Sequence, residues 1–159
     1  MRYLLTAGQA KKLDEHAIGV IGFPGLVLME KAAMTLASVL MEREDRRSGF
    51  LFVCGTGNNG GDGLAAARLL CQQGYRAAAV LIGNPKKLSE DAKTQMKLAA
   101  ACDVPVLQAE SVLSPCYDII IDALFGVGLD RAITGVYERI ITEINAAGKK
   151  VYAVDIPSG

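Results

Sequence analysis

The chain has 159 residues, of which 51% are hydrophobic and 21% charged, and its 17 basic residues balance its 17 acidic ones. This length and composition predict one domain with a sizeable hydrophobic core. Zero net charge without a basic patch does not support nucleic-acid binding, and the absence of an apolar run of about 18 residues excludes a hydrophobic membrane span. The four cysteines lack C-x-x-C spacing and are typical of reduced thiols in a cytoplasmic protein.

Two helices are expected before the first strand. Thr6 is a suitable N-cap for a helix over residues 7–18, and Gly22, Pro24 and Gly25 then interrupt the chain. A second helix over residues 26–44 is dense in Leu, Met and Ala. Its apolar residues cover much of its circumference, so we expect one face to be buried on the sheet and another to be available to a partner.

From residue 50 onward, short apolar strands alternate with helices. The expected strands cover residues 50–54, 77–82, 104–107, 117–121 and 150–154, with helices over 64–73, 90–101 and 135–147 between them. Continuous apolar strands separated by helices predict an α/β fold, a Rossmann-like three-layer sandwich with a mainly parallel sheet. In a 3-2-1-4-5 strand order, the carboxyl ends of strands one, four and five would be neighbours, where such sheets bind ligands.

The stretch between the first strand and its helix, Gly55 to Gly63, reads GTGNNGGDG. Glycines reach backbone angles that other residues avoid, and a helix N-terminus attracts anions, so this turn predicts a phosphate cradle. Its first, third and sixth residues satisfy the dinucleotide pattern G-x-G-x-x-G. A standard NAD site also needs an acid at the end of the next strand, and the sequence there is Gly83-Asn84-Pro85.

The polar residues of this turn allow two interpretations. Asp62 either caps the helix or faces a ligand. Asn58 and Asn59 either form the turn, since asparagine tolerates left-handed angles, or contribute amide groups to a site. Two adjacent asparagines are more than a turn needs, which favours the interpretation that they contact a ligand.

Two aspartates, Asp122 and Asp155, directly follow apolar strands, and Ser158 lies three residues beyond the second. Either aspartate alone could form a turn or cap a helix. Together, at the ends of adjacent strands, they indicate an oxygen-rich site suited to general acid–base catalysis or to a hard cation. His16, the only histidine, lies far from these motifs, which argues against a Ser-His-Asp or Cys-His set.

A second glycine-rich loop, Gly126-Val127-Gly128-Leu129-Asp130-Arg131, follows the fourth strand. Its backbone N–H groups and Arg131 could hold a second phosphate, or Arg131 could simply be an exposed loop residue. Tyr137, in the first turn of the next helix, could stack on a ligand ring or belong to the core.

Four motifs together resemble the YjeF N-terminal domain family, the NAD(P)HX epimerases. They lie at residues 57–63, 122–126, 128–131 and 155–159, and residues 26–31 in the second helix also resemble that family. The resemblance implies an isomerase of nicotinamide cofactor repair, which interconverts the R and S forms of hydrated NADH and NADPH (NADHX and NADPHX). A dehydratase specific for the S form, separate or fused, then restores the cofactor.

The resemblance also implies a set of site residues. A potassium ion would be held by Asn59, Asp122 and Ser158. The dinucleotide hydrate would be bound by Asn58, Asn59, Gly60, Gly61, Asp62, Gly126, Val127, Gly128, Leu129, Asp130, Arg131, Ala132, Tyr137 and Asp155. We expect Asp155 to be the acid–base group, with Asp62 as the second candidate. The missing acid after the second strand would mean that the dinucleotide is not held as in a dehydrogenase.

Two other functions are alternatives to an epimerase. A non-catalytic nucleotide-ligand-binding or protein-interaction domain of the same fold is disfavoured by the intact Asn-Asn-Gly-Gly-Asp run, and an ordinary dehydrogenase by Gly83-Asn84. The apolar breadth of residues 26–40 suggests either a homodimer or burial in the chain's own core. Family members usually continue beyond the last motif, so a single domain over residues 1–159, truncated at its C-terminal end, is expected.

Overall fold

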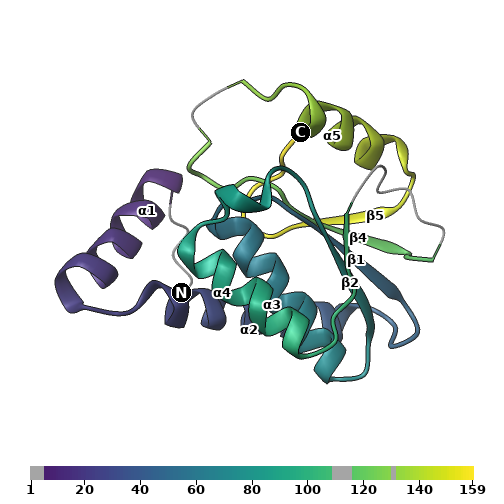
Figure 1. The fold of residues 1–159 in the computed structure, drawn as a ribbon, viewed down its shortest axis with the longest axis horizontal. Helices are drawn as coiled ribbons and strands as arrows, with labels where there is room; N and C mark the ends of the chain where they lie inside the picture. Colours follow the sequence, from purple (N-terminus) through teal and green to yellow (C-terminus); the bar gives the residue numbers. More distant parts are fainter. Residues whose placement is uncertain (1–5, 109–115, 130–131) are drawn as a thin grey trace.

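A computed structural model describes residues 6–108, 116–129 and 132–159 of the chain. Its sheet contains the strands β1 (Gly49–Cys54), β2 (Arg76–Leu81), β3 (Val106–Gln108), β4 (Ile119–Ala123) and β5 (Lys150–Ala153). All neighbouring strands are parallel and the order is β3-β2-β1-β4-β5, which confirms the predicted fold class and strand order (Figure 1). The central strand β1 is buried along its whole length because both faces of the sheet are covered.

Helices α2 (Gly25–Arg43), α3 (Asn58–Gln72) and α4 (Glu90–Ala101) cover one face of the sheet, and α5 (Val136–Ala146) covers the other (Figure 1). The remaining helical segments are α1 (Ala7–His16), a π-helical turn η1 (Ala17–Ile21) and a short turn η2 (Pro85–Lys87). Alternate residues of β1 point to opposite faces: Phe50 and Phe52 pack in the core with α2, α3 and α4, and Leu51 and Val53 in the core with α5. Within the described residues, no helix is both long and apolar enough to span a membrane.

Local capping signals placed several helix ends correctly. Thr6 accepts a hydrogen bond from the Gln9 backbone N–H, and the Gln9 side chain accepts one from the Thr6 N–H, so α1 begins with a capping box. Ser89 caps α4 in the same way at the Ala92 N–H. Gly74 and Gly148 have φ of 77° and 61°, and both follow helices that end where the sequence predicted.

The start of α3 corrects the sequence-based prediction. The helix begins at Asn58 rather than at Leu64, so Asp62 lies inside it and does not cap it; the N-cap is Gly57, which makes no side-chain capping bond. None of the glycines of residues 55–63 has a positive φ. They are needed for close approach instead, because a Cβ on Gly60 would collide with the Gly55 carbonyl oxygen, and a Cβ on Gly55 with that of Leu124.

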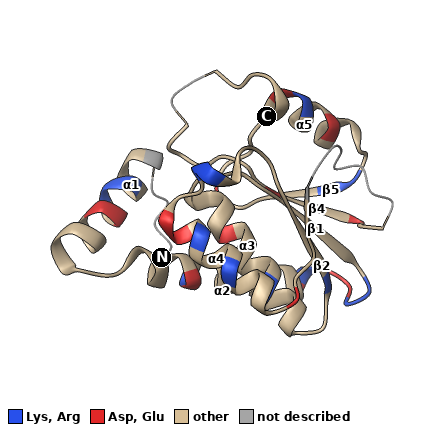
Figure 2. Ribbon diagram, in the orientation of Figure 1, with Lys and Arg blue, Asp and Glu red and all other residues tan. Residues whose placement is uncertain are grey.

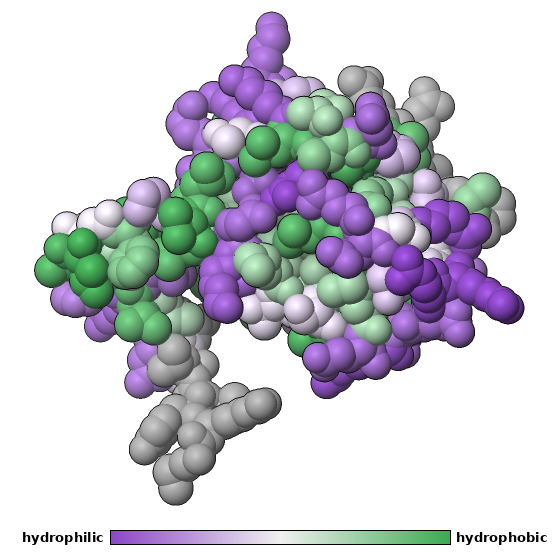
Figure 3. Space-filling view, turned by 90° about the horizontal axis from the view of Figure 1, so that it is seen from below, coloured by the Kyte–Doolittle hydropathy of each residue, from purple (hydrophilic) through white to green (hydrophobic). Residues whose placement is uncertain are grey.

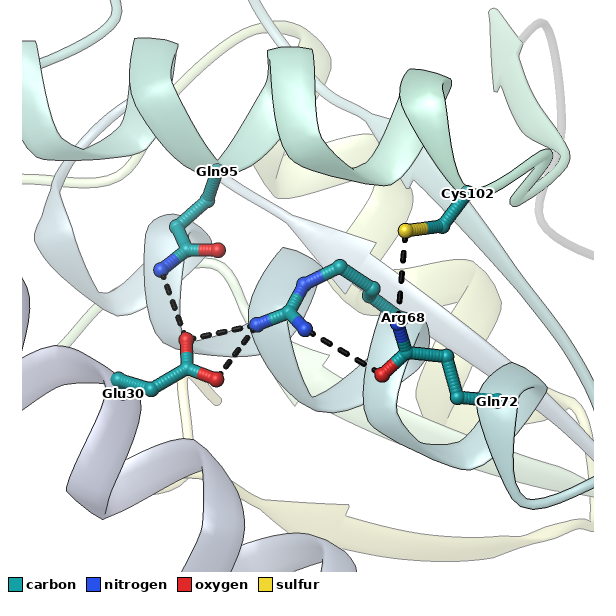
Figure 4. Close-up of polar contacts among 5 residues, drawn as sticks. All are labelled: Glu30, Arg68, Gln72, Gln95 and Cys102. Carbon is teal, nitrogen blue, oxygen red and sulfur yellow. Dashed lines mark hydrogen bonds and ion pairs between the residues drawn. The ribbon is translucent and has the colours of Figure 1, made fainter.

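A buried polar network joins the three helices on one face of the sheet (Figure 4). Arg68 of α3 donates from Nη2 to both carboxylate oxygens of Glu30 on α2, each at 2.6 Å, and Gln95 of α4 donates to Glu30 Oε2 at 3.2 Å. The side chain of Arg68 is 10% exposed and that of Glu30 36%. A charged pair this sheltered fixes α3, and with it the site at its N-terminus, against α2 and α4.

Candidate active site

The candidate site lies at the carboxyl ends of three neighbouring strands, β1, β4 and β5. Asp122 is part of β4 rather than the residue after it, and it pairs in register with Val53 of β1 and Ala153 of β5. The N-terminus of α3, which carries the two asparagines, follows β1. The parallel sheet therefore brings together motifs more than 60 residues apart in sequence, since Asn59 contacts Phe125 across a separation of 66 residues.

Hydrogen bonds to Asp122 hold Ser158 against β4. It is buried, with 5% of its surface exposed. Its Oδ2 accepts from the Ser158 backbone N–H at 2.8 Å, and its Oδ1 accepts from the Ser158 hydroxyl at 2.8 Å and from the Leu124 N–H at 3.2 Å. Hydrogen bonds to a carboxylate offset the cost of its burial, so the charge is held in a fixed position.

Phe125 links this pair to Asn59 through its backbone. The Asn59 side-chain amide donates to the Phe125 carbonyl at 2.6 Å, and the Phe125 N–H donates to the Ser158 hydroxyl oxygen at 3.3 Å. Asn59, Asp122 and Ser158, which we call the oxygen cluster, thus form one hydrogen-bonded group around Phe125. The structure brings together the three residues that the sequence nominated for a potassium ion.

The chemistry of the oxygen cluster fits a monovalent hard cation. It offers carboxylate, amide, hydroxyl and carbonyl oxygens and one formal negative charge, from Asp122. Across the described parts of the chain, no group of three or more His, Cys, Asp or Glu residues converges on a common point. The donor set is therefore unlike a zinc or iron site.

Two further carboxyl groups, Asp62 and Asp155, lie beside this cluster. Burial raises the pKa of Asp62 to about 7, and the negative charges of Asp155 and, more weakly, of Asp14 on α1 act in the same direction. Asp155 is exposed, and its Oδ2 accepts from the Val127 N–H at 2.8 Å. One carboxyl that holds a proton near neutral pH thus stands close to a second one that is open to solvent.

The loop after β4 is shaped by Asp155. A Cβ on Gly126 would lie 2.6 Å from the Asp155 carboxylate, so the absence of a side chain lets the two segments meet. Leu129 then turns back, its N–H donating to the Gly126 carbonyl at 3.1 Å. Gly128 and Ala132 are exposed, whereas Asp130 and Arg131, which the sequence nominated for ligand binding, lie outside the described residues.

The remaining nominated residues differ in their surroundings. Asn58 is exposed at the start of α3, but Gly60 and Gly61 are buried, and Gly61 packs against Met29 and Ala92. Tyr137 is half-buried: its ring centre lies 5.0 Å from that of Phe125, and its hydroxyl donates to the Ile82 carbonyl at 3.2 Å. Ligand contacts of these residues stay predictions.

Comparison with known proteins identifies the family. The family model described as YjeF-related protein N-terminus matches residues 25–159. The chain belongs to this family. It is also similar to proteins named NAD(P)H-hydrate epimerase from Limosilactobacillus fermentum, at 41% identity, and from Lentilactobacillus buchneri, at 38%. These alignments cover 98% and 100% of this chain and 74% of each relative.

A solved structure gives the same assignment of fold. The chain resembles the crystal structure of the yeast protein titled ynu0, YNL200c, with a TM-score of 0.86 and 26% identity over 99% of this chain and 72% of the yeast chain. The resemblance to the YjeF family that the sequence motifs indicated is thereby confirmed.

Sequence reasoning missed some residues that build the site of this YjeF-family chain. Phe125 lies within the motif at residues 122–126, but the sequence predicts no role for it, because it acts through its backbone N–H and carbonyl, which any residue possesses. The sequence motifs predict no role for Arg68 or Glu30 either. A signal existed for Arg68, since it is a lone charge within the apolar run Leu64 to Leu70.

Proposed function

We propose that this chain is an NAD(P)H-hydrate epimerase, an isomerase that interconverts the R and S forms of hydrated NADH and NADPH. The observation that carries the proposal is the convergence of Asp155 with the oxygen cluster at the carboxyl ends of the strands, in a member of a family whose relatives at about 40% identity bear that name. An S-specific dehydratase would consume the product and restore the cofactor.

Epimerisation at the hydrated carbon requires a proton to leave and return. We assign this step to Asp155, with Asp62 as the neighbouring carboxyl. A carboxylic acid protonates the C6 hydroxyl, the C6–O bond breaks as the ring nitrogen donates its electron pair, and water and an iminium-like ring result. Water then adds to the opposite face of C6, and the carboxylate takes back the proton, so atoms and charge balance.

The remaining polar groups would bind the dinucleotide. Asn58 and the N-terminal end of α3 face the site's edge, and the loop of residues 126–132 offers backbone N–H groups to a pyrophosphate. Tyr137, held by its hydrogen bond to Ile82, would present its ring to the ligand. With these contacts, the hydrated ring would lie near Asp155 and the phosphates near the glycine loop.

We further propose that Asn59, Asp122 and Ser158 hold a potassium ion. The ion would supply a fixed positive charge close to the substrate phosphates and the ring. Because Asp122 contributes the only carboxylate of the cluster, Asp122→Asn should abolish any rise in melting temperature that potassium produces. The comparison sets 100 mM potassium against the same concentration of a tetraalkylammonium salt, and this concentration is about a hundredfold above a Kd of about 1 mM. A potassium-dependent rise that persists in Asp122→Asn would contradict this assignment.

A homodimer is also proposed, formed through the N-terminal helices. Figure 3 shows hydrophobic side chains gathered on the arm of the molecule that α1 and η1 form, which stands away from the sheet in Figure 1. Val20 is 73% exposed, Ile21 61% and Leu13 58%. A second copy would cover these side chains, so Val20→Glu should convert a dimer to a monomer in sedimentation, whereas a chain that is monomeric from the start would overturn the idea. A cytoplasmic location stays a prediction.

The decisive experiment follows a mixture of R and S hydrates in the presence of excess S-specific dehydratase. The dehydratase alone consumes the S form quickly and the R form slowly. Adding this chain in potassium buffer should remove the R remainder quickly, and Asp155→Asn should lower that rate by about a hundredfold or more. Asp103→Asn is the matched control, because Asp103 is exposed and its positive φ of 55° suits asparagine.

Two outcomes would contradict the assignment. An R remainder that persists at its slow rate would favour the alternative, a non-catalytic nucleotide-ligand-binding or protein-interaction domain of the same fold. Full epimerase activity of the Asp155→Asn protein would leave the function intact and remove Asp155 from the reaction, which would place Asp62 first.

A further inference from the structure

An apolar pocket of about 540 Å³ opens at the carboxyl ends of β2 and β3, beside the candidate active site. Its walls come from β2, β3, η2, α4 and the start of α5. The lining residues are Leu81, Ile82, Gly83, Pro85, Leu88, Met96, Val106, Leu107 and Val136. All of them are apolar or lack a polar side chain, and the volume falls in the range of sites that enclose small organic ligands.

An aromatic pair lies between the pocket and the active site. Ile82 lines the pocket and accepts the hydrogen bond of the Tyr137 hydroxyl. The Tyr137 ring packs on Phe125, whose backbone joins the oxygen cluster. Contacts between neighbouring residues thus link one wall of the pocket to the active site.

The rim of the pocket is basic. Pro85 lines the pocket, and Lys86 and Lys87 follow it in η2, both exposed. Neither forms an ion pair with any residue that the structure describes. Figure 2 shows this short turn as a blue segment close to the carboxyl ends of the strands.

No acid opposes these lysines at the end of β2. Gly83 and Asn84 stand where dinucleotide sites that prefer NAD have a carboxylate to hold the ribose 2′-hydroxyl. Of the acids that begin α4, Glu90 pairs with Lys93 at 2.5 Å, and Asp91 lies against Gly25 of α2. Because the residues at the end of β2 include no acid, a 2′-phosphate at this rim would meet Lys86 and Lys87 without a carboxylate from β2.

We propose that the pocket receives the adenine ring of the hydrated dinucleotide and that Lys86 and Lys87 bind the 2′-phosphate, so that the chain prefers NADPHX to NADHX. The apolar walls suit a purine face, and exposed lysines suit a phosphate as point charges. This inference rests on the proposed function for its choice of ligand. It also offers a second explanation for the missing acid after β2, because a carboxylate there would repel a 2′-phosphate.

The test uses fragments that lack the nicotinamide, so that binding is measured apart from epimerisation. Adenosine 2′,5′-bisphosphate should bind about tenfold more tightly than adenosine 5′-monophosphate in calorimetry, as expected for one to two charge-assisted contacts. Lys86→Gln/Lys87→Gln should reduce this ratio to below about twofold, and Lys11→Gln/Lys12→Gln, an exposed lysine pair on α1, should leave it unchanged.

A second pair of variants tests the pocket itself. Leu107→Glu puts a charge in the pocket and should weaken both adenylates by about tenfold or more. Leu98→Glu is its control, since Leu98 is 40% exposed against 43% for Leu107 and does not line the pocket. Circular dichroism of the variants shows whether each one is folded.

Each result decides between the claims. Equal affinity for the two adenylates, or no binding of either, overturns the inference even when the chain epimerises the hydrates. Tight bisphosphate binding that depends on both lysines, in a chain without epimerase activity, supports the pocket and rejects the proposed function. If both hold, kcat/KM for NADPHX should exceed that for NADHX by about tenfold, and the lysine double variant should abolish the difference.

Discussion

Two glycine-rich stretches border the candidate active site, and they need glycine for different reasons. In residues 55–63, glycine permits close packing: a Cβ on Gly55 or Gly60 would collide with a backbone carbonyl. In the loop of residues 126–132, a Cβ on Gly126 would collide with the end of the Asp155 side chain and lie in ordinary contact with the Asn59 Cβ, and one on Gly128 would meet nothing within 4 Å. The first stretch holds α3 against the sheet, and the second leaves room for Asp155.

The two stretches show that the same glycine-rich sequence pattern can serve the fold in one place and the candidate active site in another. Glycine richness at the end of a strand is usually interpreted as a phosphate cradle, yet the glycines at the start of α3 have ordinary helical or extended angles. Substitution of Gly55 or Gly60 should therefore cost stability, and substitution of Gly126 should cost activity.

The largest effect is expected from Gly60→Ala. Its Cβ would lie against the Gly55 carbonyl oxygen, and neither backbone can move without separating α3 from β1. The free energy of unfolding should fall by about 3 kcal/mol or more in urea denaturation. Gly57→Ala is the control, since its Cβ meets no atom within 4 Å; it should cost less than about 1 kcal/mol. Equal losses would show that the packing explanation is wrong.

Arg68→Ala tests how α3 is held further along its length. Removing the guanidinium leaves Glu30 without its partner, but Glu30 is 36% exposed and can be hydrated. We expect a loss of about 2 kcal/mol in unfolding free energy, below the range for fully buried pairs. Arg76→Ala, which breaks an ion pair with Asp118 whose side chains are 56% and 57% exposed, should cost less than about 1 kcal/mol. A double-mutant cycle with Glu30→Ala measures the coupling.

Gly126→Ala should affect activity rather than stability. The new methyl group would displace the Asp155 carboxylate, which is the end of a flexible side chain and can rotate away. The melting temperature should stay unchanged, and kcat should fall by about tenfold because the acid–base group is misplaced. Gly128→Ala should alter neither quantity. If Gly126→Ala lowered the melting temperature without lowering kcat, Gly126 would serve stability rather than activity, and the proposed difference between the two stretches would be wrong.

The smallest effect concerns Asp62, the only acidic residue of the first stretch. Its pKa rises from 3.8 to about 7 on folding, so the native state binds more protons than the unfolded state across this range. Stability should therefore fall as the pH rises from about 4 to 7. Asp62→Asn should add about 1 kcal/mol to the unfolding free energy at pH 8 and much less at pH 3, where both states are mostly protonated. A gain of equal size at both pH values would rule out titration as its cause.

Local patterns in the sequence determined most of the architecture. The apolar strands, the caps at Thr6 and Ser89 and the stops at Gly74 and Gly148 depend on neighbours within a few residues. The caps and stops are where they were predicted, and the strands begin and end within two residues of the predicted bounds. The parallel strand order then followed, and with it the meeting of Asn59, Asp122 and Ser158.

Tertiary structure alone decided where α3 begins, how Asp62 is buried and which backbone groups complete the site. The early start of α3 depends on contact between Gly60 and Gly55, and the raised pKa of Asp62 on its burial beside Asp155. The role of Phe125 depends on hydrogen bonds to residues 66 and 33 positions away. Such contacts arise when distant segments pack, and no local pattern of side chains encodes them.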